Sequence, residues 1–512
     1  MGRNRKKKGD DSKDPPTDAV PDQGPPAPER QIANKTGRDQ WALRLRTELR
    51  ENEAVYLPLL STAYQGETDL LLYHIASFIS LYSHLLPPAL PDNYFKWLFG
   101  AISRAPASAL PPSFREALTA RARHVKVVRS ARRCLARKLF LYKEPTCYLA
   151  FQRTATTIQV ARLAIAYPPA GWHVAEDPEL HQMWSTYLAN CEQPDKRKPR
   201  RPVHLLDTSK LQKDIPAELN CILRDRKTDE LVAVVVRNFS GNEELLRWAK
   251  TVITEAVTTR KSVRLEDPGE IVIGGYSAGS LSKASFGFAK NLLRKQDLDA
   301  AAEAQTAIAT LLTIFWLFSR GVMPAEVIED FQNYYRENNI PRFDPNWPFI
   351  GNTGRGDLQL PLELGSFKFK DVELAPGSAM LVQRYARAVH KEHQGHKWGL
   401  AWSTLKAGSD VRGGNFFLAS FGVRIILTQD TAFAWKPEDY HTSSLGSYEP
   451  TFDVAELEDP RYNQQGVTFV TSGRLASTYA KWAAAQVPGK EKIIGFAADM
   501  TSNLKNDDCK YD

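Results

Sequence analysis

The sequence predicts an α+β fold in which helices come first and a β-rich region follows. Between 37 and 193 apolar residues recur at helical spacing, as in DQWALRLRTELREN and TDLLLYHIASFISLYSHLL. From about 365 to 485, short β-branched or aromatic runs alternate with Gly, Pro, Asp and Ser clusters, which is typical of an antiparallel sandwich or barrel. The charged, proline-broken stretch 194–203 separates the two patterns and is the predicted linker.

The two ends of the chain differ in composition from the rest. Residues 1–36 are rich in Lys, Asp, Pro and Gln, and they contain too few apolar side chains to offset the entropy of ordering. We expect this segment to be disordered, and 491–512 to be a second tail. The basic run at 3–8 is a candidate nuclear import signal, and no apolar segment follows it as a secretory signal would require. The sequence therefore predicts a nuclear, or otherwise cytoplasmic, protein that is not secreted.

Charge and composition narrow the class of partner. The 512 residues carry a formal net charge of +8, which favours an anionic partner such as nucleic acid over a neutral one. The 5 cysteines are scattered without a C-x-x-C pair, so neither a disulfide framework nor a zinc finger is predicted. The apolar run 307–318 is shorter than the roughly 20 residues of a membrane span. We expect it to form a buried helix, and we expect no membrane partner.

Several helices and strands are predicted before the β-rich region. The long helix SFREALTARARHVKVVRSARRCLARKLFLY carries basic residues that cannot all face one core, so part of it presents positive charge to solvent. ELNCILRD and LVAVVVRNF flank the turn KTDE as a hairpin, and GNEELLRWAKTVITEAV reads as a helix. EIVIGG is a short strand, and two helices follow, over about 297–320 and 324–338.

The stretch GYSAG, Gly275 to Gly279, matches the G-x-S-x-G of a serine-hydrolase nucleophile elbow. That chemistry requires a sharp strand-to-helix turn, a histidine, an acid and an oxyanion hole. No series of βα units precedes the motif and no HGGG-like segment is present, so a serine hydrolase using Ser277 is the less favoured hypothesis. We expect the glycines to permit a tight turn between a strand and a helix, with Ser277 as a polar lining group of a substrate pocket.

A metal site is the favoured hypothesis for the chemistry. His390 and Glu392 form an H-x-E at the end of the predicted strand AMLVQRYARAV, and residues i and i+2 of an extended segment project to one side. His441, after the strand TAFAWKP, can supply a third ligand. Two histidines and one carboxylate form the facial triad of non-haem Fe(II) oxygenases. His393 or His396 would replace His390 if the strand register differed by a few residues.

The segment GGNFFLASFGVRIILTQDTAFAWKPEDYHTSSL resembles the second half of the double-stranded β-helix (jelly-roll) of Fe(II)/2-oxoglutarate-dependent dioxygenases. More narrowly, its P-x-x-x-H followed by small hydroxyl residues is similar to the fungal TET/JBP-like group, as is VIGGYSAGSLSKASFGFAKN before the barrel. The resemblance covers about 205–485. It implies a TET/JBP-like dioxygenase domain over 204–490 with its barrel core at about 365–485, flanked by helices.

The resemblance also implies a set of functional residues. His390, Glu392 and His441 would bind the iron, with 2-oxoglutarate and O₂ as cosubstrates. A basic residue on the last barrel strand would pair with the distal carboxylate of 2-oxoglutarate, and Arg474 is the first choice, with Arg461 as the alternative. The implied substrate is a methylated base, of the 5-methylcytosine or thymine type, flipped out of a nucleic-acid duplex. The candidate pocket residues are Trp398, Trp402, Asn415, Tyr440 and Ser277.

One position departs from the family pattern. The family has H-x-D, whereas Glu392 is longer by one methylene group. A longer side chain shifts the carboxylate unless the backbone compensates. The alternative is therefore a catalytically degenerate relative that keeps the fold and binds nucleic acid or protein.

Overall fold

The computed structural model describes residues 112–144, 147–192, 200–280, 284–289, 298–345, 354–450 and 461–485. The chain divides into two compact units, Met1–Arg129 and Ser130–Asp512. The site described below lies wholly within the second unit. The predicted tails 1–36 and 491–512, the basic run at 3–8 and the predicted helices before residue 112 lie outside the described residues.

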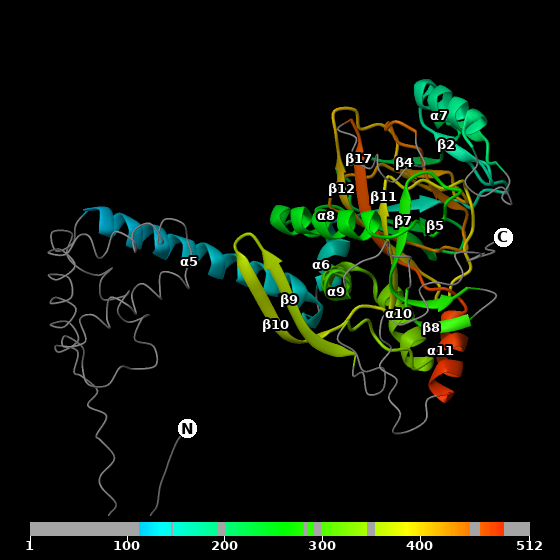
Figure 1. The fold of residues 1–512 in the computed structure, drawn as a ribbon. Coiled ribbons are helices and arrows are strands. Elements are labelled where there is room, and N and C mark those ends of the chain that lie inside the picture. Colours follow the sequence, from blue (N-terminus) through cyan, green and yellow to red (C-terminus); the bar gives the residue numbers. More distant parts are fainter. Residues whose placement is uncertain are drawn as a thin grey trace, which may run out of the picture. The chain divides into compact units, whose positions relative to one another are not determined.

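The largest element of the second unit is a nine-stranded mixed sheet (Figure 1). Its first pair is parallel, and each of its other pairs is antiparallel. In spatial order the strands are β1 (Thr156–Val160), β5 (Cys221–Asp225), β6 (Leu231–Val236), β15 (Thr431–Trp435), β12 (Gly399–Ala407), β17 (Asn463–Phe469), β11 (Ser378–Gln383), β7 (Glu270–Gly279) and β8 (Ala284–Phe288). The predicted hairpin around KTDE is confirmed as β5 and β6.

A four-stranded sheet packs against one face of the large sheet. Its order is β16 (His441–Ser443), β13 (Phe416–Leu418), β14 (Val423–Ile425) and β4 (Lys213–Ile215). Apolar side chains from both sheets form one buried cluster, in which Phe416 and Leu418 of the small sheet meet Phe433 and Trp435 of the large one. Burial of this shared apolar surface holds the two sheets together.

Helices cover the opposite face of the large sheet. α8 (Glu243–Thr258) lies against its central strands, and α9 (Leu298–Val322) packs on α8 and the sheet (Figure 1). Phe315 of α9 stacks on Phe469 of β17 with ring centroids 4.8 Å apart. α9 includes a 21-residue stretch, Ala302–Val322, that is long and apolar enough to cross a membrane, but 78% of its most apolar window is buried inside the protein. The prediction of a buried helix here is confirmed.

The remaining elements complete an α+β fold, as the sequence predicted. A separate hairpin is formed by β9 (Arg355–Leu362) and β10 (Gly365–Glu373), and β2 (His173–Ala175) pairs with β3 (Val203–Leu205). The other helices are α5 (Pro112–Leu139), α6 (Cys147–Thr154), α7 (Pro178–Asn190), α10 (Ala325–Glu337) and α11 (Leu475–Ala484), with 3₁₀ turns at Leu141–Lys143 and Thr208–Lys210.

Two strands fall in the region 37–193 that was predicted as mainly helical. β1 joins the large sheet beside β5, and β2 pairs with β3, which begins at the last residue of the predicted linker 194–203. Both strands are short, and periodicity over so few residues does not separate strand from helix. The predicted division into domains at 194–203 stays a prediction.

Candidate metal centre

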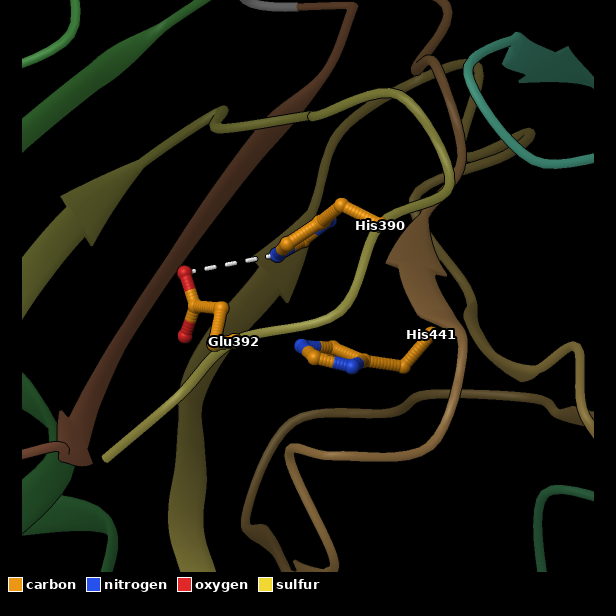
Figure 2. A group of neighbouring side chains, drawn as sticks. All are labelled: His390, Glu392 and His441. Atoms are coloured by element: carbon orange, nitrogen blue, oxygen red, sulfur yellow. Dashed lines mark ion pairs between the residues drawn. The ribbon is translucent and has the colours of Figure 1, made fainter. Parts of the chain in front are cut away.

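The three predicted metal ligands lie together in the structure (Figure 2). His390, Glu392 and His441 each offer one ligand atom, and these three atoms lie within 4.8 Å of one another. His390 Nε2 is 3.4 Å from Glu392 Oε1. His390 and His441 are 51 positions apart in the sequence, so the tertiary fold brings them together.

A short backbone pairing brings the two histidines side by side. The N–H of His390 donates to the carbonyl of His441 at 3.1 Å, and the N–H of His441 donates back to His390 at 2.9 Å. Such an antiparallel bridge places opposing side chains on the same face, and the two imidazole centroids are 4.4 Å apart. Glu392 is fixed by its own N–H, which donates to the carbonyl of Pro437 at 2.8 Å.

Backbone carbonyls select the tautomer of both imidazoles. His390 Nδ1 is 2.9 Å from the carbonyl oxygen of Ala388, and His441 Nδ1 is 2.8 Å from that of Asp439. A carbonyl oxygen only accepts, so each Nδ1 carries the proton and each Nε2 keeps its lone pair. Metal-bound histidines in proteins are commonly oriented in this way. The arrangement presents two nitrogen lone pairs beside one carboxylate.

Electrostatics favour the charge state that a divalent metal needs. Burial, the Arg387 charge and the neighbouring His441 lower the pKa of His390 to about 3, and burial also lowers the pKa of His441. Burial alone would raise the pKa of Glu392, but the nearby positive charges of Arg387 and Arg264 hold that pKa well below the usual range. At neutral pH the group is therefore two neutral imidazoles and one carboxylate.

Two arginines flank the carboxylate. Arg387 donates from a guanidinium N–H to Glu392 Oε1 at 2.5 Å, and Arg264 approaches the same oxygen at 3.7 Å. Arg387 also lies 3.6 Å from a carboxylate oxygen of Asp267. The sequence did not single out Arg264 or Arg387, because neither belongs to a motif with a recognisable spacing.

The two arginines predicted to bind the cosubstrate make other contacts in the structure. Arg474 was expected on the last strand, but β17 ends at Phe469 and Arg474 directly precedes α11. Its guanidinium donates to the carbonyl oxygens of Gly279 at 3.4 Å and Ser280 at 2.9 Å. Arg461 precedes β17 as expected of a loop residue, is largely exposed, and pairs with Glu449 at 3.2 Å.

The alternative ligands His393 and His396 do not join the group. The His393 side chain is 82% exposed and faces Glu438. His396 is a buried core residue whose Nδ1 meets the Trp398 carbonyl at 2.7 Å and whose Nε2 meets Thr471 Oγ1 at 2.9 Å. Because both ring nitrogens of His396 are engaged in these contacts, it has no free lone pair for a metal. The structure therefore places His390, and not His393 or His396, beside His441.

The predicted pocket residues separate into different environments. Trp402 is fully buried on the helix side of the large sheet, packs against Phe239 and Phe315, and donates from Nε1 to Asp430 at 3.0 Å. The pocket prediction for Trp402 was therefore wrong, because alternation along β12 turns it away from the small sheet. Trp398 is also buried, with the Lys436 ammonium 5.5 Å from its ring centroid.

Asn415 and Tyr440 lie on the side of the small sheet. The Asn415 amide donates to Glu176 and its oxygen accepts from Lys406 Nζ at 2.7 Å, so it belongs to a polar cluster at the start of β13. Tyr440 is partly exposed next to His441, and the Lys391 ammonium lies 4.5 Å from its ring centroid. Of the predicted pocket residues, Tyr440 is the immediate chain neighbour of a proposed ligand.

Ser277 lies inside a strand and not at a nucleophile elbow. β7 continues through Gly279 and turns back antiparallel into β8, with Ser277 opposite Gly287. The expected turn from a strand into a helix is thus a β-hairpin, and the elbow geometry that a serine hydrolase needs is missing at this described position. Gly275 adopts φ +93°, and an added Cβ there would lie 2.3 Å from the Gly377 carbonyl oxygen, so glycine is required by close backbone approach.

A segment that the sequence left unassigned borders the metal centre. Gly171 N–H donates to the carbonyl of Val389 at 2.8 Å, and Val389 N–H donates to that of Trp172 at 2.9 Å, one residue before His390. Arg162 pairs with Asp439 at 2.6 Å, beside the carbonyl that orients His441. These contacts join residues more than two hundred positions apart, so no local sequence pattern predicts them.

No protein-family model matches this chain, and no curated protein matches it. Among solved structures, that of NgTET1 in complex with 5mC DNA is similar, with a TM-score of 0.33 and 9% sequence identity over 67% of this chain and 90% of that one. A TM-score this low does not establish a shared fold, and we draw nothing about function from it. The residues of the metal centre must carry the functional interpretation.

Proposed function

We propose that this chain is an Fe(II)/2-oxoglutarate-dependent dioxygenase that hydroxylates a methylated base in nucleic acid, with DNA as the first candidate. The observation that carries the proposal is the metal centre itself. Two imidazoles with their Nδ1 atoms held by carbonyls present Nε2 beside the carboxylate of Glu392. Two nitrogens and one carboxylate oxygen are the donor set of non-haem Fe(II) oxygenases, in which three coordination positions stay open.

The strand order supports a double-stranded β-helix around this centre. From β11 onward, the chain alternates between the two facing sheets. β11, β12, β15 and β17 are neighbours in the large sheet, whereas β13, β14 and β16 belong to the small one, where His390 bridges to His441 at its edge. Two layers built by such alternation form a jelly roll. The ligands then lie at the edge of the small sheet, with His441 at the start of β16 and His390 and Glu392 on the connection between β11 and β12.

The donor set indicates what each residue would do. His390, Glu392 and His441 would hold Fe(II), which with 2-oxoglutarate and O₂ supplies the oxidising power to convert a C–H group to C–OH, one oxygen atom entering the substrate and the other the succinate formed with CO₂. Phe416 and Trp435 pack around His441, with ring centroids 5.9 and 5.6 Å away, and exclude water from that side.

A cation is needed to pair with a carboxylate of 2-oxoglutarate. Arg264 is a further candidate beside Arg474 and Arg461, because its guanidinium lies 3.7 Å from Glu392 Oε1. A guanidinium can bind a carboxylate through two parallel hydrogen bonds, which fixes orientation as well as charge. Arg264 thus has the position and the chemistry that the cosubstrate requires.

The substrate class rests on the sequence resemblance to the TET/JBP-like group. A base must leave the duplex to reach the metal, and aromatic and cationic side chains near the centre would receive it. Tyr440, with Lys391 over its ring, has that character and adjoins His441. The net charge of +8 favours a polyanionic partner. A nuclear location is part of the same proposal.

One observation favours a second candidate, a catalytically degenerate relative that binds nucleic acid or protein. Arg387 and Arg264 already neutralise Glu392, so the group is electrostatically satisfied by protein residues. If the Glu392 carboxylate keeps its ion pairs with the two arginines, it would bind a metal ion weakly.

Incubation with methylated DNA, Fe(II), 2-oxoglutarate and O₂, followed by mass spectrometry of the nucleosides, tests the proposal. We expect an oxidised methylated base and an equal amount of succinate. His441→Ala should abolish both, whereas the matched control His393→Ala should preserve them, because that side chain is 82% exposed and outside the metal centre. Folded protein that yields neither product with DNA or RNA would favour the degenerate relative.

A further inference from the structure

A chain of polar side chains leads away from the carboxylate of Glu392. Arg387 donates to Glu392 Oε1 at 2.5 Å, and its Nε lies 3.6 Å from Asp267 Oδ2. The hydroxyl of Tyr385 donates to that same Asp267 oxygen at 2.7 Å. Glu392, Arg387, Asp267 and Tyr385 therefore form one continuous network, called the Glu392 network below.

The Glu392 network is shielded from water along its length. The side chains of Glu392 and Arg387 are 18% and 13% exposed, and that of Asp267 is 6% exposed. Shielded charge pairs are screened little, and removal of one partner leaves the other unpaired at high cost. The side chains of the network are therefore held more firmly than those of an exposed arginine–carboxylate pair at the surface.

Two backbone segments hold the network in place. Gly269 adopts φ +79° and passes so close to the Arg384 carbonyl that an added Cβ would lie 2.2 Å from it. The N–H of Ala386 donates to the carbonyl of Pro268 at 3.0 Å. The loop that carries Asp267 therefore packs closely against the segment that carries Tyr385 and Arg387.

Glu392 has a particular need for such support. Its side chain has one more rotatable bond than the aspartate of the H-x-D pattern, so its carboxylate can occupy more positions relative to the two imidazoles. A guanidinium presents donors in a rigid planar fork and therefore fixes both the place and the plane of a carboxylate. Arg387 directs one guanidinium N–H to the Glu392 oxygen that faces His390, while its Nε faces Asp267, so the guanidinium links the carboxylate to the rest of the network.

We propose that Arg387, held by Asp267 and Tyr385, is a positioning residue that sets the carboxylate of Glu392 for metal binding and so compensates for the longer side chain. The inference rests on the metal centre of the proposed function and assigns the residues around it. Arg387 acts through Glu392 and not through the substrate. Its effect should therefore appear in metal affinity before any cosubstrate is added.

The test is a double-mutant cycle on the binding of Co(II) without 2-oxoglutarate, read by calorimetry and by the visible spectrum of the bound ion. Arg387→Ala should weaken Co(II) binding by about 10- to 100-fold, the usual effect of losing a residue that orients a ligand. Arg387→Lys should recover only part of the loss, since an ammonium lacks the planar fork. Tyr385→Phe, which removes one hydroxyl from the far end of the network, should cause a smaller loss.

The second arm of the cycle changes the ligand. In the Glu392→Asp background the shorter carboxylate no longer meets Arg387, so adding Arg387→Ala should change the Co(II) affinity by less than about 3-fold. Coupling of this kind between contacting residues is what a double-mutant cycle measures. Arg247→Ala is the matched control, because it removes an arginine whose partner is the exposed Glu363 and not a residue of the Glu392 network. It should leave Co(II) binding unchanged.

The outcomes separate the two proposals. If the wild-type protein binds no Co(II), the metal centre fails and this inference fails with it. If the wild type binds Co(II) and Arg387→Ala alters neither affinity nor spectrum, the positioning role alone is wrong. A variant that keeps its Co(II) affinity but loses 2-oxoglutarate binding would instead make Arg387 a cosubstrate ligand. Should Arg387→Ala fail to fold, Tyr385→Phe decides, and an unchanged Co(II) affinity there contradicts the proposal.

Discussion

Replacing His390 by asparagine should make the metal-free protein less sensitive to acid. The pKa of His390 is lowered from 6.5 to about 3 in the folded state, so the unfolded chain takes up the proton first. As the pH falls below 6.5, protonation favours the unfolded state, and the loss of stability grows until the folded pKa is reached. Between about pH 8 and pH 5, this single group should cost about 2 kcal/mol of unfolding free energy.

Urea unfolding at the two pH values measures that difference directly. Other groups also titrate in this window: burial lowers the pKa of His173 and His396 to about 4, and burial raises that of Glu270 to about 7, which acts in the opposite direction. Their contributions cancel when the variant is compared with the wild type. The His390→Asn protein should lose about 2 kcal/mol less than the wild type between the two pH values. Equal losses would refute the buried, neutral state of His390.

Three further changes test the fold around the centre. Ser277→Ala should leave metal binding intact, and Ser277 should not react with a fluorophosphonate probe; stoichiometric labelling would revive the hydrolase. Trp402→Ala should reduce the unfolding free energy in urea by about 3–5 kcal/mol, since the side chain is fully buried, and an effect below about 1 kcal/mol would contradict that packing. Gly275→Ala should be destabilising in the same assay because its Cβ would meet Gly377, whereas Gly473→Ala, with its nearest atom 3.7 Å away, should not.

The sequence predicted the ligand triad because its components are local patterns. An H-x-E needs only an extended segment to project both side chains together, and the aromatic run before His441 marks the strand that leads to it. The strand predicted to end at His390 is shorter than expected, because β11 ends at Gln383 and His390 pairs only through an isolated bridge. What the sequence left open was which histidine pairs with His441. The backbone bridge between His390 and His441 decides that, and such a bridge depends on the register of segments far apart in the chain.

The residues around the triad could not be predicted as well from the sequence. Arg264 and Asp267 lie on a loop before β7 with no motif of their own, and they reach Glu392 only through tertiary packing. Trp402 was predicted to line a pocket, but the first six residues of β12 are all buried, and apolar character alone does not show which side chains of such a strand face the helices. Arg474 was placed on the last strand, but β17 ends at Phe469; the next residues, Val470 and Thr471, are β-branched like those of the strand, so its end is not marked in the sequence.

The central claim is that His390, Glu392 and His441 bind one iron that also holds 2-oxoglutarate. Anaerobic addition of Fe(II) and 2-oxoglutarate to the metal-free protein, followed by visible absorption, tests it most directly. We expect the weak charge-transfer band of the chelate at one iron per chain, and we expect its loss in His441→Ala with the fold retained. A folded wild-type protein without the band, or a His441→Ala protein that keeps it, would contradict the claim.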